Sequence, residues 1–230
     1  MNLKACLVDF YGTIVHDVGL VIHEVSLEIK SATPIQSVSV EEVSLYWWNQ
    51  FYHLFNKCTG IQFQTQREIE IESLRRTLIH FQAPLDAQSL GEKMFEQWRR
   101  PAIYQDAIYF LNKVKLPIFI VSNIDRVEIM EALDYHGLEV DGVVTSEDVL
   151  SYKPKGKIYE EALQLTQCKK EEVVYIGDTL TIDVAGAIDI GMKTIWVNRT
   201  KQTHPVSIKP TITVNDLYDA VSHLEAIEVT

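Results

Sequence analysis

The sequence predicts an α/β fold, in which helices cover both faces of a parallel sheet and a helical domain is inserted after the first strand. From Pro101 onward, short apolar runs alternate with segments of helical pattern. A similar apolar run near the N-terminus is followed by a turn residue, Gly12. Between these two regions, residues 17–99 show helical periodicity and no convincing strand.

The first strand is expected within residues 3–10, which are almost all apolar, as in a strand buried on both faces. In residues 17–99, large apolar side chains recur every three or four positions, which is typical of amphipathic helices. These side chains are Val43, Trp47, Phe51 and Phe55; Ile71, Leu74, Leu78 and Phe81; and Leu90, Met94 and Trp98. We therefore expect a helical cap domain at 17–99 and a core domain formed by 1–16 and 100–230.

The core domain is expected to continue as alternating helices and strands. Asp125 and Glu128 resemble the capping pair of a helix that ends before Gly137. Pro154 suits the first position of another helix. The expected strands are 116–121, 142–145, 173–176 and 193–197, and the expected helices include 105–113, 154–165 and 181–190.

The composition excludes several classes of protein. With 47% hydrophobic and 23% charged residues, the chain resembles a folded globular protein and not a disordered one. Its net charge of −11 argues against binding to nucleic acid, which would repel it. The three cysteines are scattered, and no apolar run approaches the roughly 20 residues of a membrane span. We expect a cytoplasmic protein with neither a membrane nor a nucleic acid as partner.

Chemically suggestive residues follow several of the expected strands. Because parallel strands present their carboxyl ends at one edge of a sheet, these residues are expected to converge. They are Asp9, Tyr11, Gly12 and Thr13; Ser122 and Asn123; Lys153; and Asp178 and Asp183. Singly, each is more simply a turn former or a helix cap. Together, they predict a site for metal-assisted phosphoryl transfer.

The residue types fit that chemistry. Asp9 and Asp178 offer the hard oxygen ligands that Mg²⁺ prefers, and a carboxylate can also attack phosphorus to form an aspartyl-phosphate. Negative charge on the phosphoryl oxygens needs donors and cations to stabilise it. The residues expected to contact the substrate are Gly12, Thr13, Ser122, Asn123 and Lys153.

The order and spacing of these residues resemble the four motifs of the haloacid dehalogenase-like (HAD) hydrolase superfamily, which are D-x-D-x-T, a Ser or Thr, a Lys, and G-D-x-x-x-x-D. The resemblance covers the whole chain and implies a Rossmann-like core, with residues 17–99 as a C1 cap. It implies that Asp9 is the nucleophile and that Thr13, Ser122 and Lys153 bind the phosphoryl group. It also implies Mg²⁺ as cofactor, with Asp9, Asp178 and the carbonyl of Tyr11 as ligands and Asp183 in support.

Position 11 departs from the phosphatase pattern, which has a second Asp there as general acid and base. The form with Tyr11 is typical of the 2-haloacid dehalogenase branch, in which Asp attacks carbon without a metal. Against that branch, Asp178 and Leu180 stand where it has Ser and Asn. It also carries a substrate-binding arginine about thirty residues after the nucleophile, whereas the first arginine after Asp9 is Arg67.

We therefore expect a Mg²⁺-dependent phosphatase of a small phosphorylated metabolite, with a 2-haloacid dehalogenase as the alternative. Tyr159, six residues after Lys153, agrees with the dehalogenase branch but is common across the superfamily. A phosphonate-cleaving enzyme would need a Schiff-base lysine from the cap, where Lys30 and Lys57 are more simply surface residues. A non-catalytic phospho-ligand-binding relative is disfavoured because the clustered carboxylates are retained.

Overall fold

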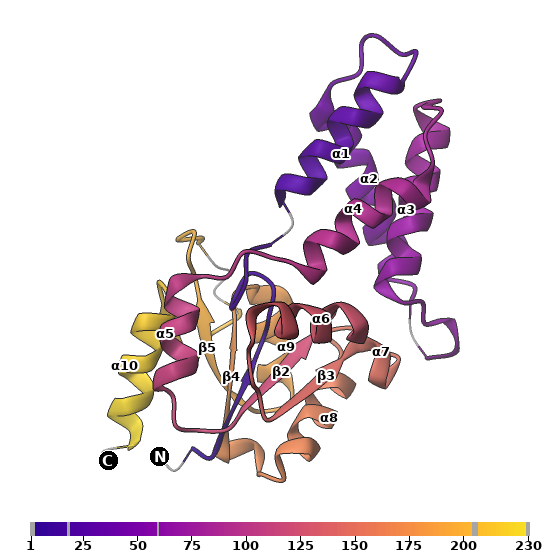
Figure 1. Cartoon of the computed structure of the whole chain (residues 1–230). Coiled ribbons are helices and arrows are strands. Elements are labelled where there is room, and N and C mark those ends of the chain that lie inside the picture. The colour runs from indigo at the N-terminus through magenta and orange to yellow at the C-terminus, as the bar shows by residue number, and fades with distance from the viewer. Residues whose placement is uncertain (1–2, 18, 59, 204–206, 229–230) are drawn as a thin grey trace. The chain divides into compact units, whose positions relative to one another are not determined.

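The computed structural model describes residues 3–17, 19–58, 60–203 and 207–228 (Figure 1). The chain forms two compact units. The sheet unit comprises Met1–Asp17, Ala102–Arg126 and His136–Thr230. The helical unit comprises Val18–Pro101 together with Val127–Tyr135.

The sheet unit contains a parallel six-stranded sheet with the order β3-β2-β1-β4-β5-β6. Its strands are β1 (Ala5–Val8), β2 (Ile118–Ser122), β3 (Gly142–Thr145), β4 (Val173–Gly177), β5 (Lys193–Val197) and β6 (Ile212–Val214). The five expected strands are present, and β6 adds an edge strand that the sequence did not predict. Every residue of β1, β2 and β4 is buried, as expected for a sheet covered on both faces.

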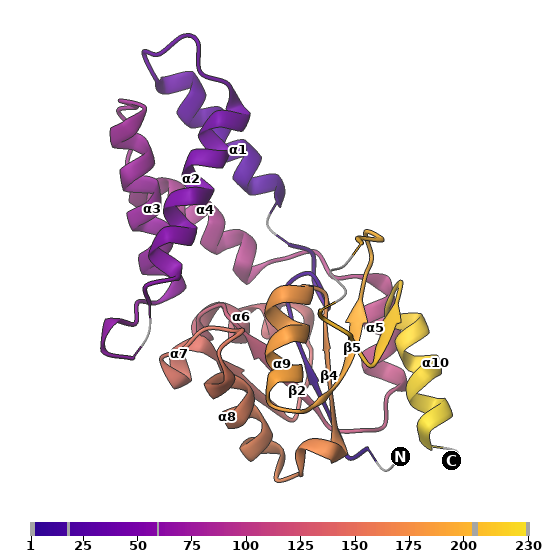
Figure 2. The ribbon, with the colours of Figure 1, turned by 180° about the vertical axis from the view of Figure 1, so that it is seen from behind.

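Helices pack on this sheet through alternate strand residues, because successive side chains of a strand point to opposite faces. Leu7 and Tyr175 face the cluster formed by α8 and α9, which contribute Ile158 and Ala187 (Figure 2). Helices α5 and α10 pack against each other. The helices and helical turns of this part of the chain are α5 (Gln105–Lys113), α6 (Arg126–His136), α7 (Ser146–Val149), α8 (Gly156–Thr166), η2 (Lys170–Glu172), η3 (Leu180–Val184), α9 (Ala185–Asp189) and α10 (Leu217–Glu228).

The structure differs in detail from three local expectations. Pro154 is not the first residue of α8, because it lies in a turn closed by the N–H of Lys155 on the carbonyl of Tyr152. The helix expected at 181–190 is divided into a π-helical turn, η3, and the short α9. The carboxylate of Glu128 does not cap α6, because it binds Arg67 at 2.5 Å.

The helical unit is a bundle whose helix starts are specified by capping residues. Its elements are α1 (Gly19–Ala32), α2 (Val40–Phe55), η1 (Gly60–Gln62), α3 (Gln66–His80) and α4 (Ala87–Arg99), with part of α6. Ser39 and Thr65 form capping boxes with the glutamates three residues later, and Asp86 caps α4. Most of the large apolar side chains expected to pack together are buried here. None of the helices in the described residues has both the length and the apolar composition needed to cross a membrane.

The two segments that lead into and out of the insertion are hydrogen-bonded to each other within the sheet unit. The N–H of His16 donates to the carbonyl of Ala102 at 2.8 Å, and that of Tyr104 donates to the carbonyl of Ile14 at 3.1 Å. Val15 and Ile103 form an antiparallel bridge between these bonds. The start and the end of the insertion are therefore joined by main-chain contacts.

Candidate active site

The candidate site lies where the order of the strands in the sheet reverses. Asp9 follows β1 and Asp178 follows β4, and these two strands are neighbours. Ser122 ends β2, which pairs with the other side of β1. Ligands of open parallel sheets bind at such a reversal, at the carboxyl ends of the strands.

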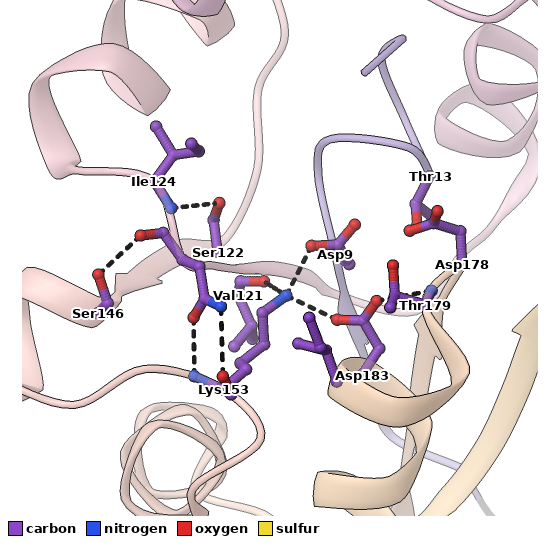
Figure 3. Close-up of polar contacts among 12 residues, drawn as sticks. Asp9, Thr13, Val121, Ser122, Ile124, Ser146, Lys153, Asp178, Thr179 and Asp183 are labelled. Atoms are coloured by element: carbon purple, nitrogen blue, oxygen red, sulfur yellow. Dashed lines mark hydrogen bonds and ion pairs between the residues drawn. The ribbon is translucent and has the colours of Figure 1, made fainter. Parts of the chain in front are cut away.

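Lys153 lies at the centre of the site and is 2% exposed. Its Nζ lies 2.6 Å from Asp9 Oδ1 and 2.7 Å from Asp183 Oδ1, and it also donates to the carbonyl of Val121 at 3.0 Å (Figure 3). Burial lowers the pKa of this ammonium group, but the charges of Asp183 and Asp9 outweigh burial and raise the pKa above its ordinary value. Lys153 therefore remains protonated and holds two carboxylates together.

Asp9 has one oxygen bound and one free of partners. Its Oδ1 accepts from Lys153, whereas its Oδ2 is buried and accepts no hydrogen bond from the described residues. Burial raises the pKa of Asp9 to about 7, with a further contribution from the charge of Asp183. Leaving a buried carboxylate oxygen without a partner costs free energy, so Oδ2 is placed to react or to bind a ligand.

Asp178 and Asp183 complete a cluster with Asp9, since one carboxylate oxygen from each lies within 4.8 Å of the other two. Both oxygens of Asp183 are bound, Oδ1 by Lys153 and Tyr175 and Oδ2 by the N–H of Thr179 at 3.0 Å. Asp178 is bound only weakly, by the hydroxyl of Thr13 at 3.4 Å. Burial and the charges of Asp9 and Asp183 raise the pKa of Asp178 to about 8.

These residues fit a divalent cation such as Mg²⁺. When ionised, the three carboxylates carry a charge of −3 and Lys153 carries +1, which leaves −2 in a buried space. A cation of charge +2 would neutralise this excess, and carboxylate oxygens are the ligands that Mg²⁺ prefers. Asp9 and Asp178 each have an oxygen that no residue of the described chain binds strongly, so these two are the candidate ligands.

The turn after Asp9 requires glycine at position 12. Gly12 has a φ of +89°, and a Cβ on it would lie 2.5 Å from Asp178 Oδ2. The next residue, Thr13, is fully buried with its hydroxyl turned toward Asp178. Tyr11 is half-buried, and its ring packs edge-on against Phe10 with 5.2 Å between the ring centroids.

Ser122 and Asn123 bind the protein's own main chain. The hydroxyl of Ser122 accepts from the N–H of Ile124 at 3.2 Å. The amide of Asn123 accepts from the N–H of Lys153 at 2.7 Å and donates to its carbonyl at 3.4 Å. Asn123 therefore fixes the main chain that carries Lys153; the substrate contact that we expected for it stays a prediction.

Sequence reasoning missed two aromatic residues of the site. The hydroxyl of Tyr175 donates to Asp183 Oδ1 at 3.1 Å, and the indole N–H of Trp196 donates to the carbonyl of Asp178 at 2.8 Å. Both lie inside strands that we interpreted only as apolar. Buried Tyr and Trp need a polar partner, and that rule was the available signal. The hydroxyl of Tyr159 instead donates to the carbonyl of Ile182 at 2.5 Å, a contact with the main chain of η3.

Known proteins resemble this chain over part or nearly all of its length. (S)-2-haloacid dehalogenase 4A of Burkholderia cepacia is 26% identical over 204 residues, which cover 86% of this chain and 84% of that protein. Pyrimidine 5′-nucleotidase YjjG of Escherichia coli (strain K12) is 38% identical over 80 residues, which cover 34% of this chain and 36% of that protein. The crystal structure of L-2-haloacid dehalogenase RSc1362 has a TM-score of 0.79 at 19% identity, over 98% of this chain and 100% of that one.

These two haloacid dehalogenases match over most of each chain, whereas the match to the nucleotidase spans about a third of each chain. The sequence model of one family, described as haloacid dehalogenase-like hydrolase, matches residues 6–197, which include every residue of the site described above. The chain belongs to the haloacid dehalogenase-like hydrolases.

Proposed function

We propose that this hydrolase cleaves a small phosphate monoester, with Asp9 as the nucleophile and Mg²⁺ as cofactor. The observation that carries the proposal is the carboxylate of Asp178, which lies with Asp9 and Asp183 in one cluster. Displacement of a halide from carbon needs one carboxylate as nucleophile and no metal, so it gives no role to the further carboxylate of Asp178. A phosphate monoester is a dianion, so the negative charge of the carboxylate cluster would repel it. The single positive charge of Lys153 does not neutralise the cluster, and a divalent cation would remove this repulsion.

In the proposed reaction, the carboxylate of Asp9 attacks phosphorus and the P–O bond to the alcohol breaks, which leaves an aspartyl-phosphate. Water then attacks that phosphorus, releases phosphate and restores the carboxylate. Lys153 binds Oδ1 of the same carboxylate, opposes the rise in the pKa of Asp9 that burial causes, and fixes its orientation. Asp183 binds Lys153 from the other side and so positions it. When bound, Mg²⁺ would supply charge stabilisation for the phosphoryl oxygens.

The proposal also predicts which substrates react fastest. Tyr11 stands where a phosphatase of this family has its general acid, and a phenol with a pKa near 10 is a poor proton donor at neutral pH. Without a proton donor, the leaving oxygen must depart as an anion. Phosphates of acidic alcohols, such as aryl phosphates, should therefore react faster than alkyl phosphates.

Hydrolysis of 2-haloacids is the second candidate function, and the comparisons favour it over the phosphatase. Several relatives that match over most of the chain are haloacid dehalogenases, and Tyr11 belongs to that pattern. In that reaction Asp9 would attack carbon and displace the halide, with no metal. The guanidinium of Arg67, the first arginine after Asp9, already binds Glu92 and Glu128 within the helical unit. It is thus engaged elsewhere and does not readily serve as the carboxylate-binding group.

Two assays on the purified protein distinguish these functions. Phosphate release from p-nitrophenyl phosphate is measured with Mg²⁺ and with EDTA, and chloride release from 2-chloropropionate is measured under the same two conditions. The proposal expects phosphate release that EDTA abolishes and Asp9→Asn eliminates. Chloride release that EDTA does not change would show that the protein is a 2-haloacid dehalogenase. Absence of activity in both assays would favour a role in ligand binding without catalysis.

A further inference from the structure

Arg199, two residues after β5, holds the main chain of the loop that follows Asp9. Its Nη2 donates to the carbonyl of Thr13 at 2.8 Å, and its Nε donates to the carbonyl of Gly12 at 3.3 Å. The side chain is 18% exposed. One guanidinium group therefore binds two successive carbonyl oxygens in the turn that connects Asp9 with the rest of the chain.

Other side chains hold Arg199 in this place. Asp106 of α5 binds the guanidinium through both oxygens, at 2.6 and 3.3 Å, and is itself buried. The N–H of Leu217, at the start of α10, donates to the same carboxylate at 2.7 Å. The ring of Tyr104 lies 3.9 Å from the guanidinium carbon, close enough for a cation–π contact. Arg199 is thus held by Asp106 and Tyr104, which lie outside the loop that it binds, and Leu217 in turn holds Asp106.

These contacts decide where the N–H of Thr13 points. In a planar trans peptide the N–H is antiparallel to the preceding carbonyl, so binding of the Gly12 carbonyl turns the N–H of Thr13 away from Arg199. Thr13 is fully buried, and its N–H donates to no acceptor among the described residues. A buried N–H without a partner is costly, so this one is available to an acceptor from outside the chain.

We infer that Arg199 is a positioning residue for the nucleophile loop, and that Asp106 holds it in place. By binding the carbonyls of Gly12 and Thr13, it sets the position of the N–H of Thr13 relative to the carboxylate of Asp9. The inference rests on the proposed role of Asp9 as nucleophile, but it applies to any anionic substrate. Lysine is a poor replacement, because a single ammonium group cannot reproduce the planar array of donors.

The kinetic test compares Arg199→Ala, Arg199→Lys and Asp106→Asn with the wild type on p-nitrophenyl phosphate and 2-chloropropionate. Misplacement of a reacting group by about 1 Å costs on the order of 100-fold in rate, so we expect kcat to fall roughly 100-fold in Arg199→Ala with little change in KM. Arg199→Lys should recover only part of this loss. Added methylguanidinium should restore activity to Arg199→Ala, whereas ethylammonium should not.

Arg126→Ala is the matched control. Arg126 also binds one carboxylate through two oxygens, those of Asp148, and one carbonyl, that of Val143, but it touches no residue of the nucleophile loop. Its kcat should stay close to that of the wild type. Wild-type kcat in a folded Arg199→Ala protein, or an equal loss in Arg126→Ala, would overturn the inference. If Arg199→Ala does not fold, unchanged kcat in Arg199→Lys and Asp106→Asn would overturn it.

Hydrogen exchange tests the inference without any activity. The N–H groups of Gly12 and Val15 donate to carbonyls within the loop, at 2.7 and 3.0 Å, and should be protected in the wild type. In Arg199→Ala these amides should exchange at least 10-fold faster, whereas amides in β4 should not change. If the wild type is inactive on both substrates, the proposed function fails, and hydrogen exchange alone then tests whether Arg199 positions the loop. Unchanged exchange at Gly12 and Val15 would then refute it.

Discussion

Glu70 should make the stability of the helical unit depend on pH. This residue of α3 is 5% exposed, and burial raises its pKa from 4.5 to about 8, an effect that the nearby indole of Trp47 offsets only in part. Between these two values, the folded protein retains a proton that the unfolded chain has released. The free energy of unfolding therefore decreases as the pH rises from about 4.5 to 8, and the stabilisation from the protonated Glu70 is lost over that range.

The size of the effect follows from the shift in pKa. Each unit of pKa corresponds to about 1.4 kcal/mol, so the 2.5 units between 4.5 and pH 7 amount to roughly 3 kcal/mol, and the full shift to roughly 5 kcal/mol. Glutamine has a similar shape and does not ionise. In Glu70→Gln, the free energy of unfolding should therefore lose most of this dependence on pH.

Urea unfolding followed by tryptophan fluorescence at several pH values between 5 and 8.5 measures this effect. Three of the four tryptophans, Trp47, Trp48 and Trp98, belong to the helical unit, so fluorescence reports mainly on that unit. Glu24→Gln is the control, because it makes the same chemical change at an exposed position of α1. Equal slopes of unfolding free energy against pH in the wild type and in Glu70→Gln would refute the reasoning.

Three further predictions concern the site. Asp9→Asn should abolish turnover without unfolding the protein, because an amide is not a nucleophile; turnover in a variant with the wild-type melting temperature would contradict this. In Asp178→Ala, activity should no longer respond to Mg²⁺, whereas most of the stability should remain, because Asp178 has only a weak hydrogen bond. Asp183→Ala should melt at a lower temperature, because it removes a hydrogen-bond partner from Lys153 and from Thr179. Thermal melts and Mg²⁺ titrations of both variants test these two expectations. Tyr11→Asp should raise turnover of alkyl phosphates far more than that of p-nitrophenyl phosphate, since positioned proton transfer contributes roughly 10²- to 10⁴-fold when the leaving group is basic; an equal gain on both substrates would show that another residue already supplies the proton.

The sequence predicted a structural feature correctly where a single physical rule connects a residue pattern with a position in the fold. Strands buried on both faces read as apolar runs, and their carboxyl ends must meet, so Asp9 and Asp178 could be placed at one edge before their contacts were known. The short strand β6 could not be found in this way. It has three residues, pairs with β5 at the edge of the sheet and leaves Thr213 exposed, so its sequence contains no apolar run from which a strand could be predicted.

Contacts with the main chain explain most of what the sequence did not reveal about the site. Asn123 looks like a substrate-binding group at a strand end, but its partners are the N–H and the carbonyl of Lys153. Arg199 also follows a strand, and its partners include two carbonyl oxygens. Every residue has a carbonyl and nearly every residue has an N–H, so no side-chain pattern marks which of them will be bound.

The main-chain pairing of residues 14–16 with 102–104 bears on how such an enzyme can evolve. Because these bonds use main-chain atoms, they tolerate changes in the side chains around them, and they join the two ends of the insertion whatever lies between. The entropic cost of closing a flexible loop grows slowly, by about 0.6 kcal/mol for each doubling of its length. A lineage can therefore lengthen, shorten or exchange the inserted segment at small thermodynamic cost while Asp9 and Lys153 stay in place. One continuous stretch of the gene can thus change in length and sequence largely apart from the residues of the site.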